Sequence, residues 1–333
     1  MNQLAIRTEA QVVPGPPRGN VTYLQPAMSP RGDNNLDSLT DRFLSSQDVK
    51  QTSKKTYEKG LTRFMGWIKE GGIGGSPTRE DILAFKGYLE VRGLSSSTLS
   101  TYLVAVRKFF EWAEGMKLYP NIAKGVKGAK KAKGFRKDPL TVGQARDLLS
   151  GVDRATIQGK RDHALLSLLV RTGLRTIEVI RAETGDIRQE GGEAVLWIQG
   201  KGRDTKDEFV LLTPETLRPL NEYLQARGKI EDNEPLFTSL SDRNRNQRLT
   251  TRTLRDIVKQ NLKGIGLDSD RLTAHSLRHT AITLSLMGGA TIQEAQGLAR
   301  HSNINTTLIY AHNINRIAQA PERKIDALLA GGN

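Results

Sequence analysis

The densest group of chemically competent side chains lies in the motif HSLRH, at residues 275–279. On a helix, His275 and Arg278 are three residues apart and lie on one face, and His279 follows His275 by one turn. Two histidines at this spacing are also typical of a metal site. However, Arg278 between them would repel a cation, and its planar fork matches two oxygens of a phosphate. The motif therefore favours an anion and predicts no bound metal.

Two further cations stand out because of their positions. Arg175 follows an apolar helix in RTGLRTIEV, where a turn would project its side chain from a rigid base. A structural ion pair with Glu178, one turn further on, explains Arg175 equally well. Lys201 lies in the Gly-Lys-Gly turn between two expected strands. Taken alone, Lys201 would be a solvated charge, and the same reading applies to Lys206.

Tyr310 is the candidate nucleophile. It lies nine residues after His301 in ARHSNINTTLIYAH, and His312 follows it by two. A phenol with the ordinary pKa of about 10 is a poor nucleophile at neutral pH. It becomes a usable one only where cations stabilise the phenolate and the transition state. Taken alone, Tyr310 would be a half-buried core residue.

The order of these signals is more specific than any one of them. The matching text is TGLRTIE at 172–178, GKG at 200–202, HSLRHT at 275–280 and GLARHSNINTTLIYAH at 297–312. Arg, then Lys on a turn, then HxxR, then His, then Tyr nine residues later resembles the tyrosine recombinases, which include phage integrases and Xer-type recombinases. The motifs cover the second half of the chain.

The resemblance implies a role for each matching residue. Arg175 and Arg278 would clamp the scissile phosphate, and His301 would hydrogen-bond to it. Tyr310 would form a 3′-phosphotyrosyl link, and Lys201 would protonate the leaving 5′ oxygen. The remaining roles are assistance at the nucleophile from His275, and support without a reacting atom from Glu178 and His279.

These side chains also bear on cofactors. Phosphodiester cleavage needs positive charge around a pentacoordinate phosphorus. Two guanidiniums and the imidazoles would supply what Mg²⁺ supplies in nucleases. A covalent tyrosyl link would conserve the energy of the broken bond, so rejoining would need no ATP. We therefore expect no metal and no nucleotide cofactor.

Composition agrees with a polyanionic partner. Among 333 residues, 50 Lys and Arg outnumber 36 Asp and Glu, which gives a formal net charge of +14. This balance favours nucleic acid first and an anionic membrane second. The absence of cysteine excludes disulfides, thiolate zinc sites, iron–sulfur clusters and cysteine nucleophiles.

The sequence shows no apolar run long enough to span a membrane and no apolar signal core at its start. We therefore expect a cytoplasmic protein without membrane contact. The resemblance implies that it works at a prokaryotic nucleoid or is encoded by a phage or mobile element.

Composition and the spacing of apolar residues divide the chain into five segments. Residues 1–35 are rich in Pro and Gly and predict a flexible tail. Apolar residues at helical spacing predict four helices over 36–120, which the resemblance implies are a helical core-type DNA-binding domain. A basic linker over 121–138 follows, then a segment over 139–320 that the resemblance implies is the catalytic domain. A tail helix over 321–333, which docks in cis or in trans, completes the expected order.

The expected fold class is mainly α, with a small antiparallel sheet in the C-terminal domain. Strands are predicted over 194–199 and 208–212, and helices over 214–227, 251–263, 274–287, 291–299 and 303–311. Thr78 with Asp81 and Thr141 with Gln144 have the spacing of capping boxes. Residues 229–248 predict a long exposed polar loop.

Basic residues on the linker and on two helices are candidates to grip phosphates or enter a groove, although each could equally be an ordinary solvated charge. They are Lys124, Lys127, Lys130, Lys131, Lys133, Arg136, Lys137, Arg107, Arg252 and Arg255. The two domains would form a C-shaped clamp around the duplex.

Together these features predict a site-specific recombinase that cleaves and rejoins double-stranded DNA through a 3′-phosphotyrosyl intermediate and a Holliday junction. The resemblance implies specific recombination sites and a homotetramer on DNA, and it leaves room for accessory directionality proteins. Two alternatives stay open: a catalytically inactive architectural DNA-binding protein, and a resolvase or type IB topoisomerase-like enzyme with the same pocket.

Overall fold

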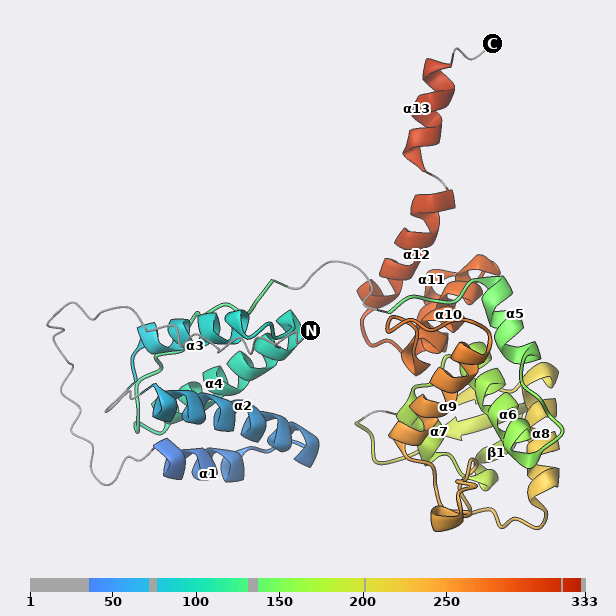
Figure 1. Cartoon of the computed structure of the whole chain (residues 1–333), viewed down its shortest axis with the longest axis horizontal. Helices are drawn as coiled ribbons and strands as arrows, with labels where there is room; N and C mark the ends of the chain where they lie inside the picture. Colours follow the sequence, from blue (N-terminus) through green and yellow to red (C-terminus); the bar gives the residue numbers. More distant parts are fainter. Residues whose placement is uncertain (1–35, 72–76, 131–136, 201, 319, 331–333) are drawn as a thin grey trace, which may run out of the picture. The chain divides into compact units, whose positions relative to one another are not determined.

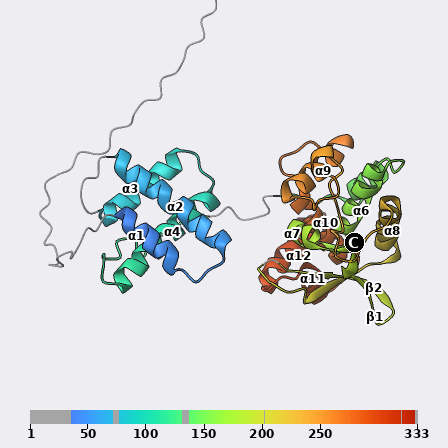
Figure 2. The same cartoon turned by 90° about the horizontal axis from the view of Figure 1, so that it is seen from below.

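A computed structural model describes residues 36–71, 77–130, 137–200, 202–318 and 320–330. The chain divides into two compact units, Met1–Ala132 and Lys133–Asn333, so the division falls inside the segment expected to link two domains. Each unit is described by itself below (Figures 1 and 2). The tail expected over 1–35 lies outside the described residues.

In its described residues the first unit is a bundle of four helices, as the sequence predicted. They are α1 (Leu36–Ser46), α2 (Gln51–Glu70), α3 (Arg79–Val91) and α4 (Ser96–Gly115). Each helix buries one apolar stripe, and fully buried phenylalanines from all four meet in the centre. Phe64 and Phe85, for example, pack edge to face with ring centroids 5.0 Å apart.

Side-chain caps fix where two of these helices begin, and the one at Thr78 was predicted. Thr78 donates from its backbone N–H to Asp81 Oδ2 at 2.8 Å at the start of α3. Ser95 Oγ accepts from the Thr98 N–H at 3.2 Å at the start of α4. In both contacts a side-chain oxygen accepts from a backbone N–H that the start of a helix would otherwise leave without a partner.

The first part of the expected linker packs on this bundle. Ala123 and Val126 are buried in its core. Arg107 donates to the Val126 carbonyl at 3.3 Å, and Arg79 donates to the Lys124 carbonyl. Residues 121–130 are therefore held on the bundle by apolar contacts and by arginine side chains, whereas the sequence had indicated only a basic linker there.

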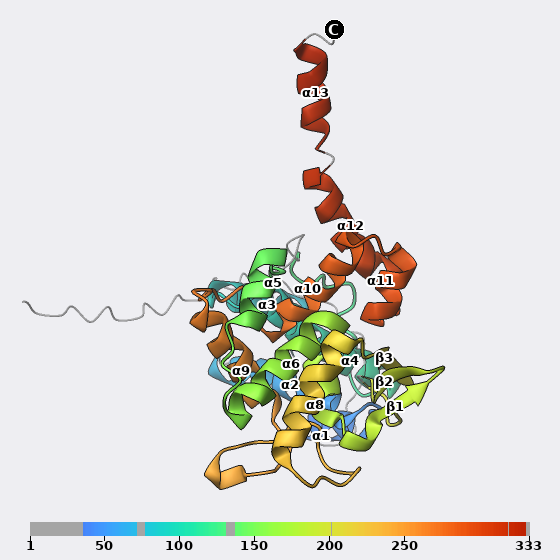
Figure 3. The same ribbon diagram turned by 90° about the vertical axis from the view of Figure 1, so that its right-hand side faces the viewer.

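The second unit is helical around a small sheet. Its elements are α5 (Val142–Ser150), α6 (Ile157–Thr172), α7 (Thr176–Arg181), η1 (Thr184–Asp186), β1 (Ile187–Glu190), β2 (Glu193–Ile198), β3 (Glu208–Leu211), α8 (Pro214–Arg227), η2 (Asp242–Asn244), α9 (Thr251–Gly264), α10 (Ala274–Met287), α11 (Ile292–Ala299), α12 (Ile304–Ala318) and α13 (Pro321–Leu329). The helix α6 is buried on nearly all sides and packs against α8 and α10 (Figure 3). The predicted capping box is present at the start of α5, where Thr141 and Gln144 exchange hydrogen bonds of 3.0 and 3.2 Å.

The sheet has three antiparallel strands in the order β1-β2-β3, where the sequence predicted only β2 and β3. The strand β1 has the sequence IRQE, which shows no apolar alternation. Gly191 and Gly192 (φ 59° and 86°) form the tight turn that folds β1 back on β2. Pairing across this turn, rather than a buried face, therefore places β1 in the sheet.

The expectation of an exposed loop over 229–248 is wrong for its middle. Leu236, Phe237 and Thr238 are buried, and Thr238 shares a hydrogen bond of 3.1 Å with the Tyr223 hydroxyl of α8. Their burial closes one side of the core of this unit. The polar residues on either side of this short apolar stretch had concealed it.

The last helix, α13, follows Pro321 and carries three exposed apolar side chains, those of Ile325, Leu328 and Leu329. No helix in the described part of the chain is both long and apolar enough to cross a membrane.

Candidate active site

A glycine with a left-handed backbone conformation ends α6 and sets the direction of the residues that follow. Gly173 has φ 61° and ψ 22°, and its N–H donates to the Leu169 carbonyl at 3.1 Å. Glycine adopts this conformation without the steric cost that a Cβ imposes. Two residues later, Arg175 occupies the N-cap of α7.

Arg175 and Glu178 form the ion pair that the sequence had left as an alternative. Arg175 Nη1 lies 2.8 Å from Glu178 Oε1, and the Arg175 backbone N–H donates to Oε2 at 2.7 Å. Glu178 is fully buried, whereas the Arg175 side chain keeps 28% exposure. Glu178 thus fixes one edge of the Arg175 guanidinium, while part of the side chain remains open to solvent.

Arg278 comes from α10 and lies deeper. It is 2% exposed and donates to the Gly173 carbonyl at 2.6 Å and to the Ala299 carbonyl. Burial, followed by the positive charge of Arg175, lowers the pKa of Arg278 to about 10, so it stays protonated at neutral pH. Backbone carbonyls from the ends of α6 and α11 therefore fix this guanidinium in place.

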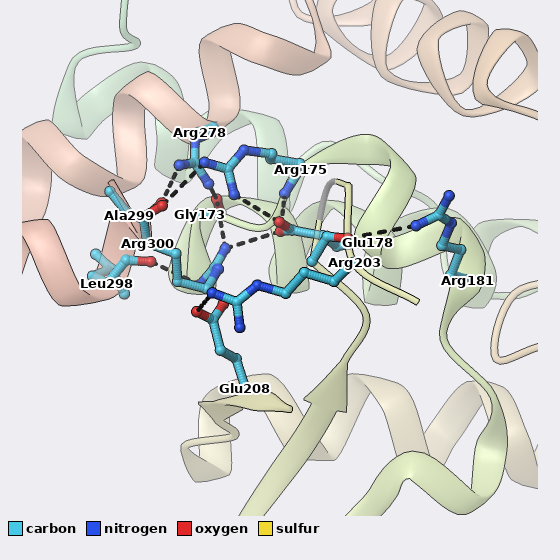
Figure 4. A network of polar contacts seen from close by, with 11 residues as sticks. Gly173, Arg175, Glu178, Arg181, Arg203, Glu208, Arg278, Leu298, Ala299 and Arg300 are labelled. Atoms are coloured by element: carbon cyan, nitrogen blue, oxygen red, sulfur yellow. Dashed lines mark hydrogen bonds and ion pairs between the residues drawn. The ribbon is translucent and has the colours of Figure 1, made fainter. Parts of the chain in front are cut away.

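A third guanidinium, which the sequence did not reveal, completes this network (Figure 4). Arg300 Nη2 lies 3.0 Å from Glu178 Oε2, and the Arg300 carbonyl accepts from Arg175 Nη2 at 3.2 Å. The only sequence signal is its place directly before His301, which does not indicate a buried charge.

Tyr310 of α12 contacts His279 of α10 and lies beside His301. Its hydroxyl shares a hydrogen bond of 2.6 Å with His279 Nδ1, and both residues are buried. The His275 ring lies 4.5 Å from the His279 ring, between centroids. The His301 ring stacks 6.3 Å from the Tyr310 ring, and His301 Nδ1 shares a hydrogen bond of 3.0 Å with Thr307.

Comparison with known proteins decides the family. The model of the phage integrase family matches residues 139–316, and that of the phage integrase N-terminal SAM-like domain matches residues 38–116. The chain belongs to the phage integrase family of tyrosine recombinases. The resemblance drawn from the motifs is thereby confirmed, and the chain is a DNA transesterase that cleaves and rejoins DNA at specific sites.

Curated relatives support the assignment over most of the chain. A tyrosine recombinase from Synechococcus elongatus is 32% identical over 270 residues, which covers 78% of this chain and 83% of the relative. The tyrosine recombinase XerC of Herpetosiphon aurantiacus is 31% identical over 266 residues, covering 78% and 84%.

Solved structures share the fold. The XerH recombinase bound to palindromic difH, a post-cleavage complex, aligns with a TM-score of 0.67 at 21% identity, over 86% of this chain and 84% of that one. A lambda integrase dimer bound to a COC′ core site aligns with a TM-score of 0.64 at 17% identity, over 81% and 96%.

The burial of this recombinase site controls its protonation. Burial raises the pKa of Tyr310 to about 12. Burial and neighbouring positive charge lower the pKa values of His279 and His301 to about 4, and desolvation followed by Arg278 lowers that of His275. At neutral pH the free recombinase therefore holds a neutral phenol and neutral imidazoles beside charged arginines.

The second lysine of the β2–β3 turn is structural. Lys206 pairs with Glu183 at 2.6 Å and with Asp186 at 2.8 Å, which ties the turn to η1. Lys201, the expected general acid, lies outside the described residues, between Gly200 and Gly202. No group of three or more candidate ligands that could hold a metal ion occurs among the described residues.

The candidate DNA contacts divide into three groups. Lys124, Lys127 and Lys130 are exposed, as are Arg252 and Arg255 on α9. Lys137 donates to the Asp270 carbonyl at 2.5 Å, beside an ion pair of 2.5 Å between Asp138 and Arg271, and so helps to hold the loop before α10. Arg107 bonds to the Val126 carbonyl, and Lys131, Lys133 and Arg136 lie outside the described residues.

Proposed function

We propose that this recombinase cleaves DNA with Tyr310 and holds the scissile phosphate between Arg175 and Arg278. The observation that carries the proposal is the buried contact of 2.6 Å between the Tyr310 hydroxyl and His279, one residue from the buried guanidinium of Arg278. A nucleophile, a proton acceptor and a phosphate-binding cation thus meet in one place, although they come from two helices.

The proposed step balances as a transesterification. Tyr310 Oη bonds to phosphorus, and the bond from phosphorus to the 5′ oxygen breaks, with its electron pair leaving on that oxygen. Lys201 gives the 5′ oxygen a proton. The phenol proton passes to the paired imidazoles, with His279 in contact and His275 behind it. Arg175 and Arg278 balance the charge on the phosphorus oxygens, and His301 hydrogen-bonds to one of them.

Rejoining is the same reaction in reverse. A 5′ hydroxyl from a partner strand attacks the phosphotyrosine and releases Tyr310, and one exchange of this kind produces a Holliday junction. The bond energy is kept in the phosphotyrosine, so we expect cleavage and rejoining to proceed in EDTA and without ATP.

The same proposal extends to assembly. The two units would close on the duplex as a C-shaped clamp, and four copies would act on two sites within a prokaryotic cell, at its nucleoid or on a mobile element. Exposed apolar side chains on α12 (Ile304, Leu308, Ile309) and on α13 (Ile325, Leu328, Leu329) support contacts between copies.

Deleting residues 321–333 should abolish tetramer formation on DNA in native electrophoresis. An unchanged tetramer would count against docking of this helix on a neighbouring copy.

Covalent capture tests the chemistry and identifies the DNA site in the same experiment. Sheared DNA from the region flanking the coding sequence is incubated with the protein in EDTA, denatured in detergent, and the protein-linked fragments are sequenced. We expect one recurrent sequence, joined through its 3′ phosphate, which Tyr310→Phe does not capture. Tight binding without any covalent fragment would instead favour an architectural DNA-binding protein.

A further inference from the structure

Arg300 occupies a turn that an arginine rarely adopts. It lies between α11 and α12 with φ 51° and ψ 49°, in the left-handed region that favours glycine. Its side chain is only 7% exposed. A long charged side chain held both in an unfavourable backbone conformation and out of water needs an explanation in what it contacts.

Its contacts lead to both proposed phosphate-binding arginines. Arg300 Nη2 lies 3.0 Å from Glu178 Oε2, while Arg175 takes the other oxygen, Oε1, at 2.8 Å. The same Nη2 lies 3.4 Å from the Gly173 carbonyl, which also accepts from Arg278 at 2.6 Å. Arg300 thus shares one acceptor group with each of the two arginines (Figure 4).

The sharing changes what Glu178 does to Arg175. A carboxylate facing a single arginine tends to bind it through both oxygens. Here Arg300 Nη2 and the Arg175 backbone N–H share Oε2. Only Nη1 of the Arg175 guanidinium therefore pairs with Glu178, its Nη2 donates to the Arg300 carbonyl, and the Arg175 side chain retains 28% exposure. Two guanidiniums then pair with one carboxylate, and Arg278 lies close enough to feel its charge. Three positive charges against one negative charge leave the cluster positive where a phosphate would bind.

We propose that Arg300 is a positioning residue of the phosphate clamp, which orients Arg175 through Glu178 and adds positive charge beside Arg278. This inference rests on the proposed roles of Arg175 and Arg278. Arg300 Nε has no hydrogen-bond partner among the described residues, so its contacts to Glu178 and to the Gly173 and Leu298 carbonyls hold the side chain.

The decisive variant is Arg300→Gly, because glycine suits this backbone and removes the whole side chain, guanidinium included. Asn246→Gly is the matched control, since Asn246 also has a left-handed backbone (φ 62°) and is exposed in another turn. Each protein is incubated with a nicked duplex that carries the captured site, and covalent adduct is measured at saturating DNA. DNA affinity is measured separately by gel shift.

We expect Arg300→Gly to slow adduct formation by about ten- to a hundredfold, as for other small misplacements of catalytic groups. Affinity for DNA and the melting temperature should remain close to those of the wild type, and Asn246→Gly should react normally. Arg300→Lys, which keeps the charge without the fork, should recover part of the rate. In a Glu178→Gln background, loss of Arg300 should cost much less, because the two residues act through one contact.

A second substrate separates positioning of the clamp from a merely structural role. A methylphosphonate at the scissile position replaces one charged oxygen by a methyl group, so it needs less positive charge. Loss of Arg300 should therefore slow the reaction of this neutral substrate less than that of the phosphate. An equal effect on both substrates, or a wild-type rate in Arg300→Gly, would overturn the inference.

Two further outcomes have a defined meaning. If Arg300→Gly fails to fold, Arg300→Gln, which keeps much of the side-chain length without the charge, takes its place in the same comparison. If Tyr310→Phe still forms adduct, the proposed function itself is wrong. A dead Tyr310→Phe together with a fully active Arg300→Gly rejects only the role of Arg300.

Discussion

The contact between Tyr310 and His279 predicts how the rate of DNA cleavage depends on pH. With a pKa of about 12, about one Tyr310 in 10⁵ is a phenolate at pH 7, which corresponds to a cost of about 7 kcal/mol. Attack by preformed phenolate would therefore gain about tenfold in rate per pH unit. A neutral imidazole 2.6 Å away offers another route, because it accepts the proton as the bond to phosphorus forms.

His279 is in the right protonation state for that route. Its pKa of about 4 leaves it neutral throughout the usual assay range. A bound phosphate would offset part of the effect of Arg278 on His279, which moves this pKa upwards but leaves burial, the larger cause, in place. We therefore expect the rate of adduct formation to be nearly constant from about pH 7 to pH 9 and to fall in acid.

Replacing His279 removes the proton acceptor. We expect His279→Ala to lose about 10²- to 10⁴-fold in the rate of adduct formation at neutral pH. Its remaining activity should rise with pH, because it then depends on preformed phenolate. His312→Ala is the matched control, since His312 is an imidazole on the same helix as Tyr310 and is exposed.

The assay is single-turnover formation of the covalent adduct on a nicked duplex, at saturating protein and constant ionic strength. A wild-type rate that rises about tenfold per unit across this range would refute the role of His279. A His279→Ala variant with a flat profile and a loss below about tenfold would refute it equally.

Three further predictions concern stability and binding. Protonation of His279 should destabilise the folded protein in acid. Its folded pKa of about 4 lies below its unfolded value of about 6.5, so its contribution to stability is present above pH 6.5 and is lost as pH falls towards 4. In urea unfolding the free energy of unfolding should fall by about 2 kcal/mol between pH 7 and pH 5, and His279→Gln should abolish this loss. Gly173→Ala should cost about 1–2 kcal/mol, measured by thermal unfolding, because Gly173 is left-handed and an added Cβ would lie 3.3 Å from the Cβ of Ala281; an unchanged melting temperature would contradict this. If Lys124, Lys127 and Lys130 contact phosphates, each change to Gln should reduce the slope of log affinity against log salt by about 0.9, and an unaltered slope would show that they are solvated charges.

Local signals made much of the fold predictable. Helix starts at Thr78 and Thr141 were predicted because a capping side chain acts within three residues of itself. The apolar helix before Arg175 was also expected, and in the structure a left-handed glycine, Gly173, ends it. The strand β1 was missed because its place depends on pairing with β2, and its own residues show no alternation.

The candidate site was predictable to a different depth. Residue types and their order singled out Arg175, Arg278 and Tyr310 as candidates, but not which atoms meet. His275 was expected to assist the nucleophile, and that role stays a prediction. In the structure Tyr310 shares its hydrogen bond with His279. His275 and His279 are one helical turn apart, so the rotation of α10 relative to α12 decides which of the two rings meets Tyr310. Arg300 was missed because a left-handed backbone at a residue other than glycine leaves no trace in composition or periodicity.

Burial affects the nucleophile and its surroundings in opposite ways. It keeps Tyr310 a phenol, and therefore unreactive, in the free protein. The same exclusion of water strengthens the attraction between the fixed arginines and a phosphate that enters beside them. Since Arg278 is held by backbone carbonyls and Arg175 by a buried carboxylate, neither has to reorganise when charge develops on phosphorus. Under the proposed roles, a phosphate bound at this site would itself supply the conditions under which Tyr310 gives up its proton.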